Sequence, residues 1–303
     1  MAIIGPGPLC EMAGSFNISR RSSRYPGCLP STVMSHVIAI ANQKGGVGKT
    51  TTAINLGASL AAAEKRVLII DMDPQGNTSS GLGVNTRTTR STIYGVLLNH
   101  VPIGSALIRG VHLPLLDVVP STTSLVGAEV ELTGQPRWRH RLREALDGIR
   151  EMYDYILIDC PPALGVLTLN TLVAADSVIV PLQAEYFALD GLSQFTETVQ
   201  VVREHLNPRL TIEGVLLTMF DGRLKLARQI SLQVREHFGD RVFQTTVPRN
   251  VRLAEAPGFG LPVIMYDVGS LGAQAYLALA GELVRRTEAE RVAAGGGHLA
   301  LVR

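Results

Sequence analysis

Residues 44–51 read Lys-Gly-Gly-Val-Gly-Lys-Thr-Thr, and this octet decides the fold. It follows an apolar run at residues 37–41 that predicts a strand, and it precedes a run from Thr52 that predicts a helix. A glycine-rich turn between a strand and a helix wraps backbone N–H groups around a polyphosphate. In such a loop Lys49 reaches the outer phosphates and the Thr50 hydroxyl can bind Mg²⁺. The octet therefore predicts a phosphate-binding site.

The octet departs from the ordinary phosphate loop at one position. The ordinary pattern has a glycine five positions before Gly48, whereas Gln43 stands there in this chain. A second lysine, Lys44, follows it directly. Because Lys49 already serves the protein's own nucleotide, Lys44 has no need to do so.

Strand-like and helix-like segments alternate after Ser35. The strand candidates are continuous apolar runs, as expected for strands covered on both faces, at residues 37–41, 67–71, 115–119, 155–159, 177–182, 211–219 and 241–245. Helical periodicity is expected over residues 136–149, beginning at Pro136, and over residues 189–206 and 271–290. This alternation predicts an α/β fold: a doubly wound, mostly parallel sheet with helices on both faces.

Length and composition fit one large α/β domain, which we place at residues 36–290. The chain has 303 residues and 46% hydrophobic content. Residues 1–35 are rich in Gly, Pro, Ser and Arg and predict a disordered arm, with Met34 as an alternative start; residues 291–303 predict a flexible tail. Three cysteines without metal-binding spacing favour a reduced, cytoplasmic compartment, and no apolar stretch is long enough to span a bilayer.

Three further segments extend the signal from the octet. They read Leu-Ile-Ile-Asp-Met-Asp-Pro-Gln-Gly-Asn at residues 68–77, Ile-Leu-Ile-Asp-Cys-Pro-Pro at residues 156–162, and Pro-Arg-Asn-Val-Arg-Leu-Ala-Glu-Ala-Pro at residues 248–257. Together the four motifs resemble the ParA/MinD ATPases, which carry a deviant Walker A phosphate loop, and in particular their ParA/Soj branch. The likeness runs from about residue 35 to about residue 288. It implies a P-loop fold and hydrolysis of ATP with Mg²⁺.

The resemblance also implies roles for individual residues. Asp73 orients the attacking water, Thr50 and Asp159 hold the metal, and Lys44 reaches across an ATP-dependent homodimer to the partner's nucleotide. Without the resemblance, Asp71 and Asp73 would be read as two turn carboxylates. The implied catalytic residues are Lys44, Lys49 and Asp73, and the implied nucleotide-binding residues are Gln43, Lys44, Gly45, Gly46, Val47, Gly48, Lys49, Thr50, Thr51, Met219, Pro248 and Asn250.

Charge is unevenly distributed along the chain. Residues 221–252 contain seven basic and three acidic residues, a net charge of +4, whereas the whole chain carries only +2. Such a basic stretch favours binding to polyanions. The resemblance implies that Arg223 and Arg252 grip double-stranded DNA without sequence preference. No base-reading module is apparent, so contacts to phosphates are expected.

The resemblance implies a ParB-type centromere-binding partner and association with the nucleoid. The nearest rival is a MinD-like ATPase that cycles on and off the membrane, which would need an amphipathic helix at its carboxyl terminus. Residues 295–297 are Gly-Gly-Gly and only six residues follow, which disfavours that reading. A nitrogenase-reductase-like protein would need cluster cysteines, and Cys160 is the only cysteine of residues 36–290. A nucleotide-binding module without hydrolysis is disfavoured by Asp73 and Asp159.

Overall fold

The computed structural model of this protein describes residues 35–296. Residues 1–34 of the arm predicted at residues 1–35, and residues 297–303 of the tail predicted at residues 291–303, lie outside the described residues. The last helix, α11 (Leu271–Gly296), includes residues 291–296, where the sequence places the beginning of the tail.

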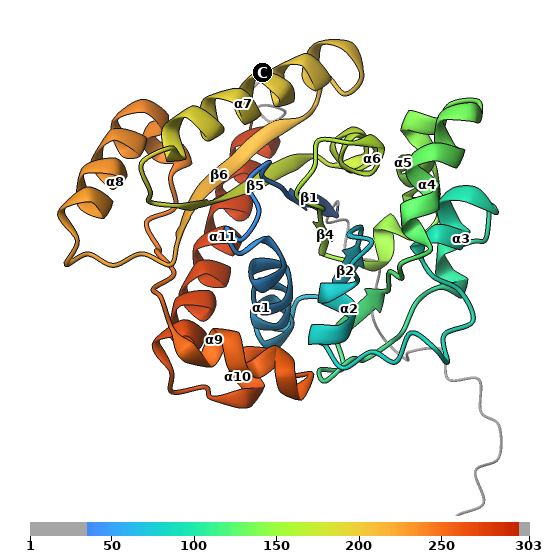
Figure 1. Cartoon of the computed structure of the whole chain (residues 1–303), viewed down its shortest axis with the longest axis horizontal. Helices are drawn as coiled ribbons and strands as arrows, with labels where there is room; N and C mark the ends of the chain where they lie inside the picture. The colour runs from blue at the N-terminus through green and yellow to red at the C-terminus, as the bar shows by residue number, and fades with distance from the viewer. Residues whose placement is uncertain (1–34, 297–303) are drawn as a thin grey trace, which may run out of the picture. The chain divides into compact units, whose positions relative to one another are not determined.

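Six strands form one parallel sheet in the order β3-β2-β4-β1-β5-β6 (Figure 1). Their bounds are β1 His36–Ile40, β2 Val67–Asp71, β3 Leu116–Val119, β4 Tyr155–Asp159, β5 Ser177–Gln183 and β6 Thr211–Thr218. These six segments confirm six of the predicted strands to within about two residues at each end, and every pairing between them is parallel. The predicted doubly wound α/β fold is therefore confirmed.

Helices cover both faces of the sheet, and this explains why the strands are apolar throughout. In β1, Val37 and Ala39 belong to one core cluster, while Ile38 and Ile40 belong to the other. Helices α1, α10 and α11 lie on one face, and α3 to α8 lie on the other (Figure 1). The remaining bounds are α1 Lys49–Ala62, α2 Asn77–Gly81, α3 Ile93–Leu98, α4 Leu125–Glu131, α5 Arg141–Leu146, α6 Val166–Ala174, α7 Ala188–His205, α8 Lys225–Phe238, α9 Val251–Glu255 and α10 Val263–Tyr266.

The winding of the sheet reverses next to β1. From β1 the chain moves outward to β2 and β3, returns to insert β4 between β2 and β1, and continues beyond β1 with β5 and β6. Ligands of open parallel sheets bind where the winding reverses, outside the carboxyl ends of the strands. The register brings Asp159 at the end of β4 opposite both Asp71 of β2 and Ile40 of β1. Two carboxylates therefore lie beside the loop that leaves β1.

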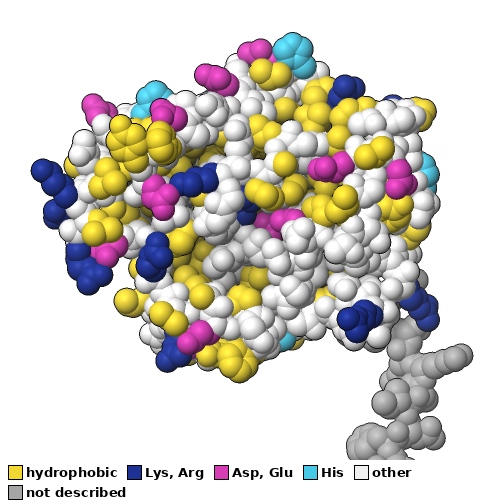
Figure 2. All heavy atoms as spheres, viewed as in Figure 1, with side chains coloured by type: hydrophobic (Ala, Val, Ile, Leu, Met, Phe, Trp, Pro, Cys, Tyr) yellow, Lys and Arg dark blue, Asp and Glu magenta, His cyan; other side chains and the backbone are white. Residues whose placement is uncertain are grey.

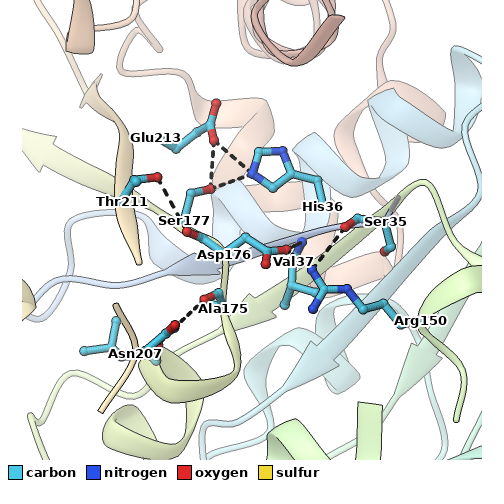
Figure 3. Close-up of polar contacts among 11 residues, drawn as sticks. Ser35, His36, Val37, Arg150, Ala175, Asp176, Ser177, Asn207, Thr211 and Glu213 are labelled. Carbon is cyan, nitrogen blue, oxygen red and sulfur yellow. Dashed lines mark hydrogen bonds and ion pairs between the residues drawn. The ribbon is translucent and has the colours of Figure 1, made fainter. Parts of the chain in front are cut away.

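The opposite, amino-terminal edge of the sheet is fastened by a polar network (Figure 3). The Ser177 hydroxyl donates to Glu213 at 2.7 Å and lies 2.9 Å from the His36 ring, so β1, β5 and β6 are linked. Asp176 accepts from the backbone N–H of Val37 at 2.8 Å and from the Arg150 guanidinium. These contacts hold the strand starts, which leaves the carboxyl edge to carry the loops of the site.

The predicted strand at residues 241–245 is wrong. Only Val242 makes a parallel bridge, to Val215 of β6. The backbone N–H groups of Gln244 and Thr245 donate instead to the Glu282 carboxylate of α11, at 2.8 and 2.9 Å. A side chain thus takes the donors that a seventh strand would need.

The predicted helix at residues 136–149 is only partly correct. Arg137 has a left-handed φ of 55°, which an α-helix does not accommodate. A short 3₁₀ turn follows at Trp138–His140, and α5 itself covers only Arg141–Leu146. Pro136 therefore precedes an irregular turn rather than beginning a helix.

Candidate nucleotide-binding site

The loop between β1 and α1 has the backbone shape that phosphate binding needs. Gly46 and Gly48 adopt left-handed φ values of 74° and 89°, which residues with a Cβ atom rarely adopt. Gly48 directly precedes α1. The unpaired N–H groups and the positive dipole end of that helix therefore face the loop and suit an anionic ligand.

Neighbouring strands hold this loop at both ends. The Asn42 side chain donates to the carbonyl of Pro181 in β5 at 2.8 Å and accepts from the N–H of Lys44 at 3.0 Å. The hydroxyl of Thr218, at the end of β6, donates to the Val47 carbonyl at 2.8 Å. The loop is therefore preorganised before any ligand arrives, which lowers the entropy lost on binding.

Lys49 lies inside the curve of the loop. Its Nζ donates to the Lys44 carbonyl at 3.0 Å, and its side chain is buried. Burial lowers the pKa of Lys49, while the negative charge of Asp159 acts in the opposite direction. A phosphate placed in the loop would favour the charged ammonium further.

Asp159 is fully buried beneath the loop. Its Oδ2 accepts from the Thr50 hydroxyl at 2.8 Å and from the Thr78 hydroxyl of α2 at 2.7 Å. Burial, followed by the charge of Asp71, raises the pKa of Asp159 to about 7, and the two hydroxyls act against this rise. Its Oδ1 has no hydrogen-bond partner among the described residues. An unpartnered buried carboxylate oxygen beside a hydroxyl fits a divalent cation.

Asp71, the last residue of β2, and Asp73, just after it, have different surroundings. Asp71 is buried, and its oxygens accept from the N–H of Asp73 at 3.1 Å, the N–H of Ser79 at 2.9 Å and the Ser79 hydroxyl at 2.6 Å. Burial raises the pKa of Asp71 to about 6. Asp73 lines the cavity described next and accepts from the N–H of Gln75 at 2.9 Å. Asp71 therefore supports the turn, and Asp73 faces the space where a ligand would lie.

A cavity of about 530 Å³ opens beside the loop. Its far wall forms where the chain just after β6 runs beside residues 245–250. A parallel bridge between Phe220 and Pro248 joins these two segments. Tyr276 of α11 closes another side and hydrogen-bonds Thr52 of α1 at 3.1 Å. Ten residues of the predicted site line this cavity: Gly45, Gly46, Gly48, Lys49, Thr50, Thr51, Asp73, Met219, Pro248 and Asn250.

Four other residues predicted to bind the nucleotide or the metal do not line the cavity. Val47 and Asp159 are buried behind its wall. Gln43 is half-buried at the beginning of the loop. The Lys44 side chain is 42% exposed, and its Nζ lies 2.5 Å from a carboxylate oxygen of Glu185.

Arg223 lies in the loop between β6 and α8, and Arg252 lies in the short helix α9. The Phe220–Pro248 bridge joins the segments that precede them. Arg223 is 90% exposed and pairs with Asp221 at 2.7 Å, whereas Arg252 pairs with Glu255 at 2.8 Å and with Asp267 at 3.2 Å. Figure 2 shows Lys and Arg side chains gathered over α8, the helix that follows the loop containing Arg223.

Sequence reasoning missed several residues that complete the site. The hydroxyls of Thr78 and Ser79 hold the two buried aspartates, and they follow the Asp-Pro-Gln-Gly motif so closely that their position was a usable signal. Asn42 lies just before the octet, so its part in the site could also have been recognised from the sequence. Tyr276 gave no local signal, because it lies more than 200 residues from Thr52, the residue of α1 that it hydrogen-bonds. Glu185, which pairs with Lys44 outside the cavity, gave none either.

A glycine-rich loop at the switch point of a parallel sheet, followed by a buried helix that begins Lys-Thr, defines a P-loop nucleoside triphosphatase. A family model described as an AAA domain matches residues 35–212. The chromosome partitioning protein ParA of Myxococcus xanthus is 56% identical over 253 residues, covering 84% of this chain and 89% of that protein. The chain therefore belongs to the ParA/Soj family of chromosome-partitioning ATPases.

Two further comparisons agree. The sporulation initiation inhibitor protein Soj of Bacillus subtilis is 51% identical over 250 residues, covering 82% of this chain and 98% of that protein. A crystal structure of cobyrinic acid a,c-diamide synthase from Mycobacterium smegmatis, with bound ADP and magnesium, has a TM-score of 0.73 at 37% identity. That comparison covers 84% of this chain and 96% of the other. Across residues 35–296 no helix is long and apolar enough to cross a membrane.

Proposed function

We propose that this protein is an ATP-driven DNA-partitioning switch. Its ATP-bound dimer binds DNA without sequence preference, and hydrolysis releases it. The observation that carries the proposal is the convergence of three distant segments on one cavity, the 44–51 loop, Asp73 and the 248–250 segment, with Asp159 buried beneath the loop and bonded to Thr50. Residues 36–290 form the ATPase domain in this proposal.

The cavity suits ATP with its phosphates in the glycine loop. The N–H groups at the beginning of α1 and the Lys49 ammonium would bind the phosphate oxygens. The base would lie toward the other end, between Met219 and the segment that contains Pro248 and Asn250. This orientation places the negatively charged phosphates beside the Lys49 ammonium and the positive end of α1, which both lie at the glycine loop.

The residues beneath the loop fit Mg²⁺. Thr50 and the unpartnered Oδ1 of Asp159 would hold it. Within residues 35–296 no group of three or more acidic, His or Cys side chains is placed to hold a metal ion. That agrees with Mg²⁺, which is commonly bound by one or two carboxylates together with substrate phosphates. When bound, the ion neutralises charge on the phosphate oxygens.

Hydrolysis in this proposal depends on Asp73. It lines the cavity, and the hydrogen bond from Gln75 to one of its oxygens fixes the carboxylate. A fixed carboxylate can orient water for attack on the γ-phosphate, and positioning is most of what phosphoryl transfer requires. ADP and phosphate are the products.

Dimerisation depends on Lys44. Its side chain lies outside the cavity of its own protomer, where Lys49 already occupies the loop. A long and flexible ammonium side chain suits contact with the nucleotide of a second copy. Loss of the γ-phosphate would then remove contacts on both sides of the dimer, which makes the assembly a switch.

The decisive test of the proposal is nucleotide-dependent dimerisation. Light scattering in a non-hydrolysable ATP analogue with Mg²⁺ is expected to give twice the monomer mass of 32.5 kDa, whereas ADP gives the monomer. DNA retention should follow the same order of nucleotides. A chain that stays monomeric in saturating analogue would contradict the proposal.

DNA binding is expected to require Arg223 and Arg252. Replacing both with Ala should weaken DNA binding by about tenfold or more, because each dimer loses four phosphate contacts. Their present ion pairs with Asp221 and Glu255 are solvent-exposed, so phosphates can compete for them. The measurement is DNA retention of the analogue-bound dimer, with dimer mass recorded in parallel.

A matched control removes the same charge elsewhere. Arg137→Ala combined with Arg209→Ala changes two exposed arginines outside residues 221–252 and should leave retention near that of the wild type. Raising the salt concentration should weaken wild-type binding steeply. A salt-independent affinity would instead indicate base reading, and simultaneous loss of dimerisation in the Arg223/Arg252 variant would place those arginines in the fold or the dimer interface.

A ParB-type DNA-binding protein is the expected partner, and it would stimulate hydrolysis and release the dimer from nucleoid DNA. The support is the family itself, whose relatives at 56% and 51% identity are named ParA and Soj. The MinD-like alternative, a membrane-cycling ATPase, gains nothing from these relatives. Vesicle flotation with ATP tests it, because the proposed protein should stay unbound.

A further inference from the structure

Lys44 is held within its own protomer. Its Nζ lies 2.5 Å from Oε2 of Glu185, and the two side chains are 42% and 46% exposed. Glu185 follows β5 and precedes α7, and its N–H donates to the Gln183 carbonyl at 2.8 Å. The ion pair therefore joins the loops that follow two neighbouring strands, β1 and β5, at the carboxyl edge of the sheet.

Two exposed aromatic side chains follow Glu185 directly. Tyr186 is 77% exposed and Phe187 is 68% exposed, whereas Ala188, where α7 begins, is buried. The two rings meet edge to face, with centroids 5.0 Å apart. Figure 2 shows hydrophobic side chains on the surface over the beginning of α7. Exposed aromatic residues are typical of protein-binding surfaces.

We infer that residues 185–187 are a contact segment for a second copy of this chain, and that Glu185 restrains Lys44 until that copy docks. The inference rests on the proposed ATP-dependent dimer. It adds to that proposal a docking surface, Tyr186 and Phe187, and an internal competitor, Glu185, for the lysine that must cross the interface.

The arrangement of charge and apolar surface identifies the occupant as a second copy. For Lys44 to reach a partner's nucleotide, the surface around Lys44 has to face that partner. The ion pair links residues 185–187 to Lys44, so both copies present this segment to the interface. Each copy brings a cation, an anion and two aromatic rings, a set that is complementary to itself.

Release of Lys44 in this scheme costs little. The Lys44–Glu185 pair is exposed on both sides, and exposed ion pairs stabilise a protein weakly. The released Glu185 carboxylate can be hydrated. A triphosphate on the facing copy carries more charge than one carboxylate, so it can displace Glu185, while a diphosphate offers a weaker competitor.

Two variants test the inference in opposite directions. Glu185→Gln removes the competing charge and should lower the dimer dissociation constant in analogue about twofold or more, because each dimer releases two pairs. Tyr186→Ser combined with Phe187→Ser should raise that constant at least about tenfold. Nucleotide affinity of the monomer should stay near that of the wild type in both variants. Val130→Ser is the matched control, because Val130 is 78% exposed on α4.

Hydrogen exchange on the wild-type protein gives an independent measurement that does not rely on a variant folding. Amides of residues 184–188 should be protected in analogue at dimer-forming concentrations and unprotected in ADP. Unchanged exchange in a dimer whose mass has doubled would overturn the inference, as would variants that dimerise like the wild type. A wild-type chain that remains a monomer in analogue would instead overturn the proposed function.

Discussion

Replacing Asp73 with alanine is expected to slow ATP hydrolysis about 100-fold or more, while ATP binding and dimerisation persist. The variant loses the carboxylate that faces the cavity but keeps the glycine loop, Lys49 and Asp159. It should therefore accumulate as an ATP-bound dimer on DNA. Phosphate release measures the first effect, and light scattering with ATP itself measures the second.

An asparagine at the same position separates charge from shape. Asp73→Asn keeps an oxygen that can accept from the N–H of Gln75, so the turn after β2 should be preserved. Hydrolysis by this variant should be nearly as slow as with alanine, because a neutral amide orients water less strongly. Wild-type turnover in the alanine variant would show that the assigned role is wrong.

Replacing Lys44 with alanine is expected to abolish ATP-dependent dimerisation, and with it DNA retention. The monomer should still bind ATP, because the carbonyl of residue 44 remains to accept from Lys49 and the loop glycines are unchanged. Two intermolecular charge contacts disappear from each dimer, so the dimer dissociation constant should rise at least about tenfold. Sedimentation in saturating analogue measures that constant.

Lys65→Ala provides the matched control for Lys44. Lys65 is also partly exposed, and its Nζ lies 3.8 Å from a Glu288 oxygen, but it lies in neither the glycine loop nor the cavity wall. This variant should dimerise like the wild type. A Lys44→Ala variant that also dimerises normally would remove Lys44 from the interface and leave its ion pair with Glu185 as a purely local contact.

The sheet was predictable because its strands are apolar on both faces and separated by helical periodicity. Most residues of each of the six confirmed strands are buried, and the local sequence alone identifies these segments. The position of the phosphate loop was also predictable from local sequence, since Gly46 and Gly48 supply the left-handed backbone that the turn requires. The roles of the site residues stay predictions until the variants above are measured.

What the sequence could not supply depends on contacts between distant segments. Asp71 and Asp73 look alike in the motif, yet Ser79 holds one in the interior while the other lines the cavity. The backbone N–H donors of Gln244 and Thr245 are taken by Glu282, nearly 40 residues later, so the segment predicted as a strand at residues 241–245 is not one. Likewise, the sequence around Lys44 does not indicate that Glu185 forms an ion pair with it.

Tyr276 has a consequence for how the protein is made. It belongs to α11, near the end of the chain, yet it forms part of the cavity wall and bonds to Thr52 of the first helix. A nascent chain that has emerged from the ribosome only up to residue 212 contains the whole glycine loop but lacks Tyr276 and the wall that it forms. Ribosomes add about 5–20 residues per second, so the interval lasts several seconds. Tight capture of the nucleotide, and any assembly that requires it, is thereby deferred until translation is almost finished.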